Sequence, residues 1–126
     1  MGEISRIVNV NQYELKTSAD EYRAAITALA ARTESEGHAG VVSYQWFVDR
    51  SAGTAGAVIV YADAEAWLAH HRMAYEWPEM PALQATVTLT SLTMLGPTSP
   101  EIDEFFAGAS LPLTQYREPV AGFDRG

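Results

Sequence analysis

The amino-acid sequence predicts an α+β fold in which two helices cover one face of a four-stranded antiparallel sheet. Three observations indicate this fold. Four separate segments show the alternating or continuous apolar patterns of β-strands. Two capping residues, Ser18 and Asp63, each precede a segment with helical apolar spacing. The order of these segments is β-α-β-β-α-β, which is the split βαβ or ferredoxin-like arrangement.

The first half of the chain is predicted to form a strand, a helix and a second strand. Ile4 to Tyr13 mixes Ile and Val with polar residues in near-alternation, which suits a strand with polar groups on both faces. The capping box Ser18-Ala19-Asp20-Glu21 opens a helix from about Ala19 to Glu36, and Gly37 ends it. Helical spacing places Tyr22, Ile26, Leu29 and Thr33 on one face of this helix. Val41 to Asp49 then suits a strand with one bulky apolar face.

The following segment is predicted to form a third strand, a second helix and a fourth strand. A Gly-rich turn leads into a strand at Ala57 to Tyr61, which completes an antiparallel hairpin with the strand before it. An Asp cap opens a helix of about Ala64 to Tyr75, which Pro78 and Pro81 end. Gln84 to Leu95 alternates β-branched residues and is expected to be the fourth strand.

Residues 97–126 are expected to extend the fold at its C-terminal end. Thr98 to Glu101 forms another capping box, which opens a short helix that ends near Ala107. Thr114 to Arg117 suits a short fifth strand, and a tail follows from Ala121. We therefore expect one domain over residues 1–126, with residues 97–126 adding a short helix, a strand and a tail.

Composition excludes several classes of function. The formal net charge of −8 argues against nucleic acid or an anionic membrane surface as partner, because phosphate binding needs an excess of Lys and Arg. The chain has no Cys, so it has no thiolate nucleophile, disulfide or Cys-ligated metal, which fits our expectation of a cytoplasmic protein. The start reads as a strand, without a signal peptide, and no apolar run approaches the ~20 residues of a membrane span.

The predicted sheet has a second face that is also apolar. On the central hairpin, Trp46 and its neighbour Phe47 point to opposite faces, as do Val58 and Ile59. Two helices on one face cannot bury both sets of side chains. We therefore expect a homodimer in which two sheets face each other around a two-fold axis.

The second predicted helix carries an aromatic stripe and two adjacent histidines. At about 100° per residue, Trp67, His70 and Trp77 fall on the side that faces the sheet. His71 lies at the other edge of this stripe, where it is expected to face solvent or the dimer partner. Because adjacent side chains on a helix diverge, the two histidines cannot bind one metal ion as an i, i+4 pair can, and no metal site is expected.

His70, Asn9 and Asn11 are the polar candidates for a functional site. His70 suits a base or hydrogen-bond donor in an aromatic cavity, or a structural histidine bonded to a carbonyl group. Asn9 and Asn11 lie two residues apart and so project from one strand face, where they could orient a ligand carbonyl or lie in water at the rim. Neither a nucleophile elbow nor a nucleotide-binding Gly pattern is present, and no cofactor is expected.

The strand, Asp cap and helix around Glu65-Ala66-Trp67-Leu68-Ala69-His70 resemble the antibiotic biosynthesis monooxygenase-like family of the dimeric α+β barrel group. The Glu36-Gly37 pair and the aromatic strand around Tyr44 are also similar. The C-terminal segments around Gly96 and Tyr116 resemble a longer-tailed branch of this group. The chain departs from the family pattern after His70.

The resemblance implies cofactor-independent monooxygenation of an electron-rich quinol, anthrone or polycyclic phenol. In that reaction dioxygen attacks a substrate carbanion or phenolate, so the protein removes a proton, stabilises the oxyanion and excludes water. His70 would be the base, and Asn9 or Asn11 would hold a carbonyl oxygen. The remaining candidates would line the substrate pocket: Tyr44, Trp46, Tyr61, Trp67, His71 and Trp77.

Two other functions are consistent with the same residues. Some barrel relatives that carry Asn, Trp and His oxidise haem. A different class is a non-catalytic dimer that binds a small aromatic ligand, in which the aromatic cavity has no matched base.

Overall fold

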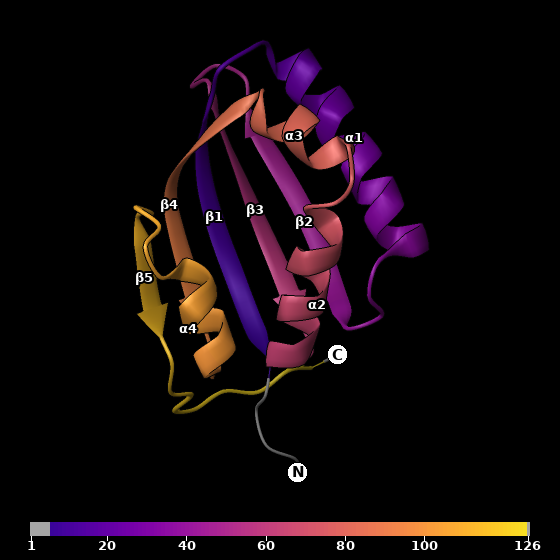
Figure 1. Cartoon of the computed structure of the whole chain (residues 1–126). Coiled ribbons are helices and arrows are strands. Elements are labelled where there is room, and N and C mark those ends of the chain that lie inside the picture. Colours follow the sequence, from indigo (N-terminus) through magenta and orange to yellow (C-terminus); the bar gives the residue numbers. More distant parts are fainter. Residues whose placement is uncertain (1–5, 126) are drawn as a thin grey trace.

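The computed structural model describes residues 6–125 and shows one sheet with helices packed on one of its faces (Figure 1). The elements in chain order are β1 (Ile7–Leu15), α1 (Ala19–Glu36), β2 (Val41–Asp49), β3 (Thr54–Tyr61), α2 (Ala64–Ala74), α3 (Glu79–Gln84), β4 (Val87–Leu95), α4 (Pro100–Phe106) and β5 (Leu113–Tyr116). Ile4 and Ser5, which were expected in the first strand, lie outside the described residues. None of the helices in residues 6–125 has the length and apolar character that a membrane crossing requires.

The sheet confirms the ferredoxin-like arrangement and corrects the expectation of four antiparallel strands. The strand order is β2-β3-β1-β4-β5, and the first four strands pair antiparallel. The fifth strand, β5, pairs parallel with β4, so the sheet is mixed and five-stranded. The segment that contains α4 carries the chain from the end of β4 back to a point partway along this strand. From there β5 can run beside β4 in the same direction.

Helix α1 has the predicted boundaries and the predicted buried face. The Ser18 side chain accepts a hydrogen bond from the Glu21 backbone N–H over 3.1 Å, which satisfies one of the free donors of the first turn. Its buried residues are those of the predicted apolar stripe: Tyr22, Ile26, Leu29 and Thr33. Packing of this stripe against the sheet forms one of the two hydrophobic clusters of the core.

The segment after α2 forms a helix that the sequence analysis missed. The prediction placed prolines 78 and 81 in a break and began the fourth strand at Gln84, whereas residues 79–84 form α3 and β4 begins at Val87. Pro78 occupies the N-cap of α3 and Pro81 lies in its first turn. Backbone N–H groups there have no partners within a helix, so a proline costs little at these positions.

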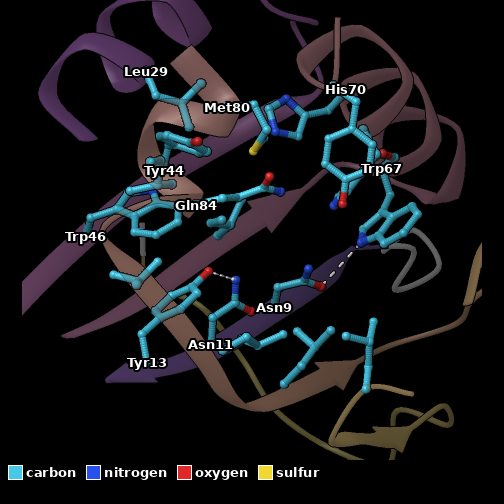
Figure 2. A pocket seen from close by; sticks show the side chains of 18 of the residues that line it. Asn9, Asn11, Tyr13, Leu29, Tyr44, Trp46, Trp67, His70, Met80 and Gln84 are labelled. Atoms are coloured by element: carbon cyan, nitrogen blue, oxygen red, sulfur yellow. Dashed lines mark hydrogen bonds between the residues drawn. The ribbon is translucent and has the colours of Figure 1, made fainter. Parts of the chain in front are cut away.

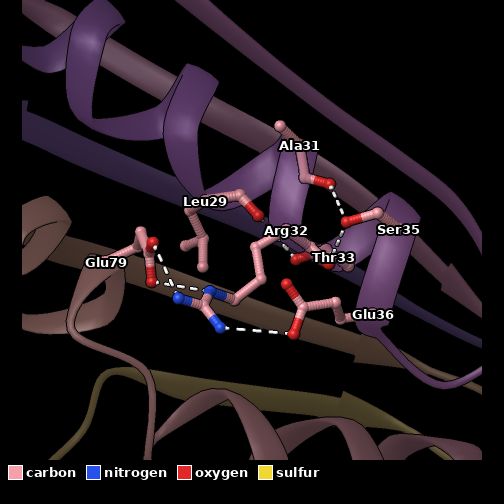
Figure 3. A network of polar contacts seen from close by, with 7 residues as sticks. All are labelled: Leu29, Ala31, Arg32, Thr33, Ser35, Glu36 and Glu79. Atoms are coloured by element: carbon pink, nitrogen blue, oxygen red, sulfur yellow. Dashed lines mark hydrogen bonds and ion pairs between the residues drawn. The ribbon is translucent and has the colours of Figure 1, made fainter.

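Arg32 connects α3 to α1 (Figure 3). Its guanidinium Nε lies 2.9 Å from Glu79 Oε1, and Nη1 lies 3.4 Å from Glu36 Oε1. The same guanidinium lies over the ring of Trp77, 5.4 Å from its centroid. These contacts hold the start of α3 against α1. They thereby position α3, which follows α2 in the chain.

The C-terminal helix α4 is part of the core. Ser99, one residue later than the predicted Thr98, caps it by accepting a hydrogen bond from Ile102 N–H over 3.3 Å. Ile102 is fully buried and belongs to the same cluster as Trp67 and Met94. Phe105 meets the Trp67 ring edge-on, with 5.3 Å between centroids. Residues 97–116 therefore complete the layer of helices as well as the sheet.

The opposite face of the sheet carries no helix within the described residues (Figure 1). Strand alternation places Val10, Val58 and Phe47 on this face, and Phe47 and Val58 are 55% and 38% exposed. Leu95 and Tyr116 continue the same apolar surface across β4 and β5. We call this surface, made of Val10, Phe47, Val58, Leu95 and Tyr116, the outer sheet face.

Candidate active site

A cavity of about 290 Å³ lies between the sheet and the four helices. Its lining contains no Lys, Arg, Asp or Glu among the described residues, and most of its wall is apolar or aromatic. The polar groups that reach it are side chains of Asn, Gln, His and Tyr. A cavity of this kind suits an uncharged, flat molecule that is oriented by a few hydrogen bonds.

Strand β1 supplies the polar floor of the cavity (Figure 2). Successive strand residues point to opposite faces, so Asn9, Asn11 and Tyr13 share the face that the helices cover. Asn9 is only 3% exposed, and both amides point into the cavity between the aromatic walls. The alternative of two asparagines in water at a rim is therefore wrong for this strand.

Hydrogen bonds fix the direction in which each amide points. The indole Nε1 of Trp67 donates to Asn9 Oδ1 over 3.4 Å. Asn11 Nδ2 donates to the Tyr13 hydroxyl over 2.9 Å, which leaves its buried Oδ1 without a hydrogen-bond partner among the described residues. Asn9 can therefore offer an N–H donor to a bound molecule, and Asn11 can offer an acceptor.

The aromatic wall is built from β2 on one side and α2 on the other (Figure 2). Tyr13 stacks on Trp46 with 5.6 Å between ring centroids, and Tyr44 tilts against Trp46 at 5.7 Å. Tyr61 lies below α2 and contacts Trp67 at 6.4 Å. Burial raises the pKa of Tyr44 to about 12 and the pKa of Tyr61 well above its ordinary value, so both phenols stay protonated.

His70 is buried between two phenol rings. The ring centroids of Tyr44 and Tyr61 each lie 5.8 Å from that of His70. Burial, together with the smaller effect of the nearby His38, lowers the pKa of His70 to about 4. Its Nδ1 has no hydrogen-bond partner among the described residues, and its Nε2 makes no hydrogen bond to a carbonyl there, so the alternative of a structural histidine bonded to a carbonyl group is not supported.

His71 also lines the cavity and is only partly exposed, which corrects in part the expectation that it faces solvent or a partner chain. Its ring stacks on the indole of Trp67 with 3.7 Å between centroids and 20° between planes. Its Nδ1 lies 2.7 Å from the Trp67 carbonyl oxygen. Helical side chains lean back over the preceding turn, a direction that the angular spacing alone does not contain. Burial lowers the pKa of His71 to about 3, although the Trp67 carbonyl opposes this shift.

The structure brings together all but one of the residues that were predicted for the site: Asn9, Asn11, Tyr44, Trp46, Tyr61, Trp67, His70 and His71. Trp77 does not line the cavity and packs instead under Arg32 beside α1 and α3. The prediction placed Trp77 on the apolar stripe by assuming helical spacing up to that residue. Helix α2 ends at Ala74, so this spacing does not extend to Trp77.

Sequence reasoning missed several lining residues. Tyr13 shares the strand face of Asn9 and Asn11, so its position could have been found from the alternation. Gln84 enters the cavity from α3, and Phe105 enters from α4 (Figure 2 labels Gln84). Neither position was found, because Gln84 was predicted to begin the fourth strand and the helix that carries Phe105 was predicted as an extension of the fold.

The described residues contain no group of three or more His, Asp or Glu side chains that is placed to hold a metal ion. The two adjacent histidines lie with 5.3 Å between ring centroids and nearly perpendicular planes. What the arrangement offers chemically is two neutral imidazoles beside oriented amides, in a mostly apolar cavity.

Comparison with known proteins supports the fold. No family model matches the sequence, and no curated protein matches it. Among solved structures, MupZ from Pseudomonas fluorescens has a TM-score of 0.74 at 15% identity, covering 96% of each chain. SnoaB, a cofactor-independent oxygenase from Streptomyces nogalater, has a TM-score of 0.57 at 19% identity, covering 71% of this chain and 90% of its own.

A candidate antibiotic biosynthesis monooxygenase from Caulobacter crescentus CB15 has a TM-score of 0.55 at 20% identity, covering 72% of this chain and 87% of its own. The chain therefore has the fold of the antibiotic biosynthesis monooxygenase-like proteins, as its sequence predicted.

Proposed function

We propose that this chain, which has the fold of antibiotic biosynthesis monooxygenase-like proteins, is a cofactor-independent monooxygenase. Its substrate is an electron-rich quinol, anthrone or polycyclic phenol that is held in the cavity beside α2. The observation that carries the proposal is the composition of the cavity: an uncharged aromatic wall, two oriented amides and two neutral imidazoles, of which His70 is buried and His71 partly buried. The solved oxygenase SnoaB shares the fold, which adds support.

The cavity residues can perform each step that such a reaction needs. The aromatic rings of Tyr44, Trp46 and Trp67 stack on the flat substrate. The side-chain amide N–H of Asn9 donates a hydrogen bond to the substrate oxygen on which negative charge develops. A neutral imidazole removes a proton from the substrate, and the sequence analysis assigned this role to His70.

The atoms balance without a bound cofactor, because the substrate itself is the reductant. For an anthrone, loss of a C–H proton leaves a carbanion that reduces dioxygen and forms a C–O bond to it. Return of the proton gives a hydroperoxide, which loses water as the carbon becomes a carbonyl. One oxygen atom stays on the substrate and the other leaves as water.

The direct test is oxygen uptake by the purified protein with anthrone or a hydroxylated anthrone, measured with a chelator present and no added flavin. We expect catalysed uptake of one O2 per substrate and a quinone product. If the protein binds these compounds but leaves the rate of their spontaneous oxidation unchanged, it is a ligand-binding module and the proposal is wrong. A spectral titration with hemin tests the haem alternative.

We also propose that the protein is a homodimer with its two sheets face to face. The outer sheet face supports this, because Phe47, Val58 and Tyr116 form an apolar surface that no element within residues 6–125 covers. Burial of such a surface against its own copy is the least costly way to remove it from water. The cavity lies on the other side of the sheet, so each chain would hold a separate site.

A further inference from the structure

The two adjacent histidines of α2 differ in what their Nδ1 atoms contact. Nδ1 of His71 lies 2.7 Å from the backbone carbonyl oxygen of Trp67. A carbonyl oxygen can only accept a hydrogen bond, so this Nδ1 must carry the hydrogen. A neutral imidazole has a single N–H, and the Nε2 atom of His71 is therefore left with a free lone pair.

The surroundings of His71 hold this tautomer and its ring orientation in place. The ring is stacked 3.7 Å above the Trp67 indole and meets Phe105 at 5.7 Å. Its Nε2 makes no hydrogen bond within the described part of the chain, and the residue lines the cavity. Nε2 is consequently the ring nitrogen of His71 that is free to accept a proton from a substrate in the cavity.

His70 has the opposite arrangement. Its Nδ1 is enclosed and has no hydrogen-bond partner among residues 6–125. Buried N–H groups without an acceptor are rarer in proteins than acceptors that lack a donor, so the hydrogen belongs on Nε2. The enclosed atom is Nδ1, which leaves Nε2–H as the side of the ring that a ligand in the cavity can reach.

We propose that His71 is the catalytic base of the site and that His70 is a hydrogen-bond donor to the substrate. This assignment rests on the proposed monooxygenase function and reverses the role that the sequence suggested for His70. The substrate proton moves to Nε2 of His71, while the electron pair stays on the substrate carbon or oxygen. Nε2–H of His70 then donates to the oxygen that carries the negative charge.

The stacked indole of Trp67 strengthens this division of roles. When His71 takes the proton it becomes a cation directly above the Trp67 ring, where the ring electrons stabilise it. The Trp67 carbonyl remains bonded to Nδ1–H in both states. The proton is later returned from Nε2 of His71 to the peroxide oxygen that leaves as water, so the residue ends the cycle as it began.

The tautomers can be measured without any substrate. Two-bond proton–nitrogen correlation spectra of the 15N-labelled protein at neutral pH distinguish protonated from unprotonated ring nitrogens. We expect Nδ1–H with unprotonated Nε2 for His71, and the reverse for His70. The same tautomer at both residues, or exchanged tautomers, overturns the assignment, whatever the protein oxidises.

Two matched variants test the roles. In His71→Asn the side-chain amide can still donate to the Trp67 carbonyl, but the base is lost, and we expect kcat to fall about 10²- to 10⁴-fold. In His70→Gln an N–H donor remains near the position of Nε2, and we expect a fall of less than about tenfold together with a higher KM. A larger loss of kcat in His70→Gln than in His71→Asn places the base at His70 and overturns the proposal.

The outcomes separate this inference from the function on which it rests. If the wild-type protein does not catalyse oxygen uptake, the monooxygenase proposal fails, and the His71 base role fails with it, while the tautomer spectra still report on the geometry. If the wild type is active and a variant does not fold by circular dichroism, the tautomer spectra decide the assignment.

Discussion

The indole N–H of Trp67 reaches across the cavity to the amide oxygen of Asn9, 3.4 Å away, and so joins helix α2 to strand β1. Both residues are buried, at 0% and 3% exposure. The contact orients the Asn9 amide with its N–H group free for a ligand. It also means that the position of the substrate donor depends on how α2 is packed.

A double-mutant cycle measures this connection. Trp67→Phe keeps a buried aromatic ring but removes the N–H donor, and Asn9→Leu removes the acceptor. From urea unfolding we expect each single variant to lose about 1 to 3 kcal/mol of unfolding free energy. The double variant should lose about 1 kcal/mol less than the sum, because the second change then removes no hydrogen bond. Strictly additive losses would show that the contact contributes nothing to stability.

Stability should fall between pH 7.5 and pH 5.5 because His70 and His71 resist protonation in the folded chain. Their pKa values of about 4 and about 3 lie below the value of 6.5 for the unfolded chain. In this range the unfolded chain therefore binds more protons than the folded chain does. The stabilising contribution is complete above pH 6.5 and is lost as the pH falls toward the folded pKa values, by about 1 kcal/mol for each histidine at pH 5.5.

The matched control is the double variant His70→Gln with His71→Asn, which cannot titrate at these positions. Carboxyl groups with lowered pKa values, such as those of Asp20 and Asp49, are the same in both proteins and cancel in the comparison. Urea midpoints at the two pH values should differ less in the variant than in the wild type. An equal difference in both proteins would mean that the histidines are not buried in neutral form.

The parts of the fold that the sequence predicts are those with a local physical cause. Helix α1 was found to the residue, because Ser18 caps it and the stripe from Tyr22 to Thr33 has helical spacing. Strand β2 was also predicted with its observed boundaries, because its bulky apolar residues alternate along Val41 to Asp49. Helix α3 was missed because its prolines lie in the first turn, where the usual rule that proline breaks a helix does not apply.

The sequence predicted most of the residues of the candidate site, but not the directions in which all of their side chains point. Alternation along β1 placed Asn9 and Asn11 on one face, and helical spacing placed Trp67 with His70. The angle of His71 around α2 suggested solvent, yet its side chain folds back onto Trp67 and into the cavity. Contacts from far along the chain, such as Phe105 on Trp67, have no signal in a single sequence.

Ile102 tests whether the C-terminal helix is part of the folding unit. The side chain is fully buried in the cluster that contains Trp67 and Met94. We expect Ile102→Ala to lower the free energy of unfolding by about 2 to 4 kcal/mol, since it removes buried methyl groups and leaves a cavity. The neighbouring Glu101 is exposed, so Glu101→Ala should change stability by less than about 0.5 kcal/mol. Equal, small effects in chemical denaturation would show that α4 is detached in solution.

Val58 tests the proposed dimer. It lies on the outer sheet face opposite Val10, and 38% of its surface is exposed in a single chain. If two sheets pack face to face, Val58→Asp places a carboxylate in an apolar interface, where an unpaired charge is strongly unfavourable. Sedimentation velocity at micromolar concentration should then show a dimer for the wild type and a monomer for the variant.

Thr27→Asp is the control for Val58→Asp, because it adds the same charge to an exposed position of α1, on the other side of the sheet. This variant should sediment as the wild type does. Circular dichroism should show that Val58→Asp remains folded, since the substituted side chain reaches water once the chains separate. A wild-type monomer at this concentration, or a Val58→Asp dimer, would mean that the apolar outer sheet face is not the contact between two copies of the chain.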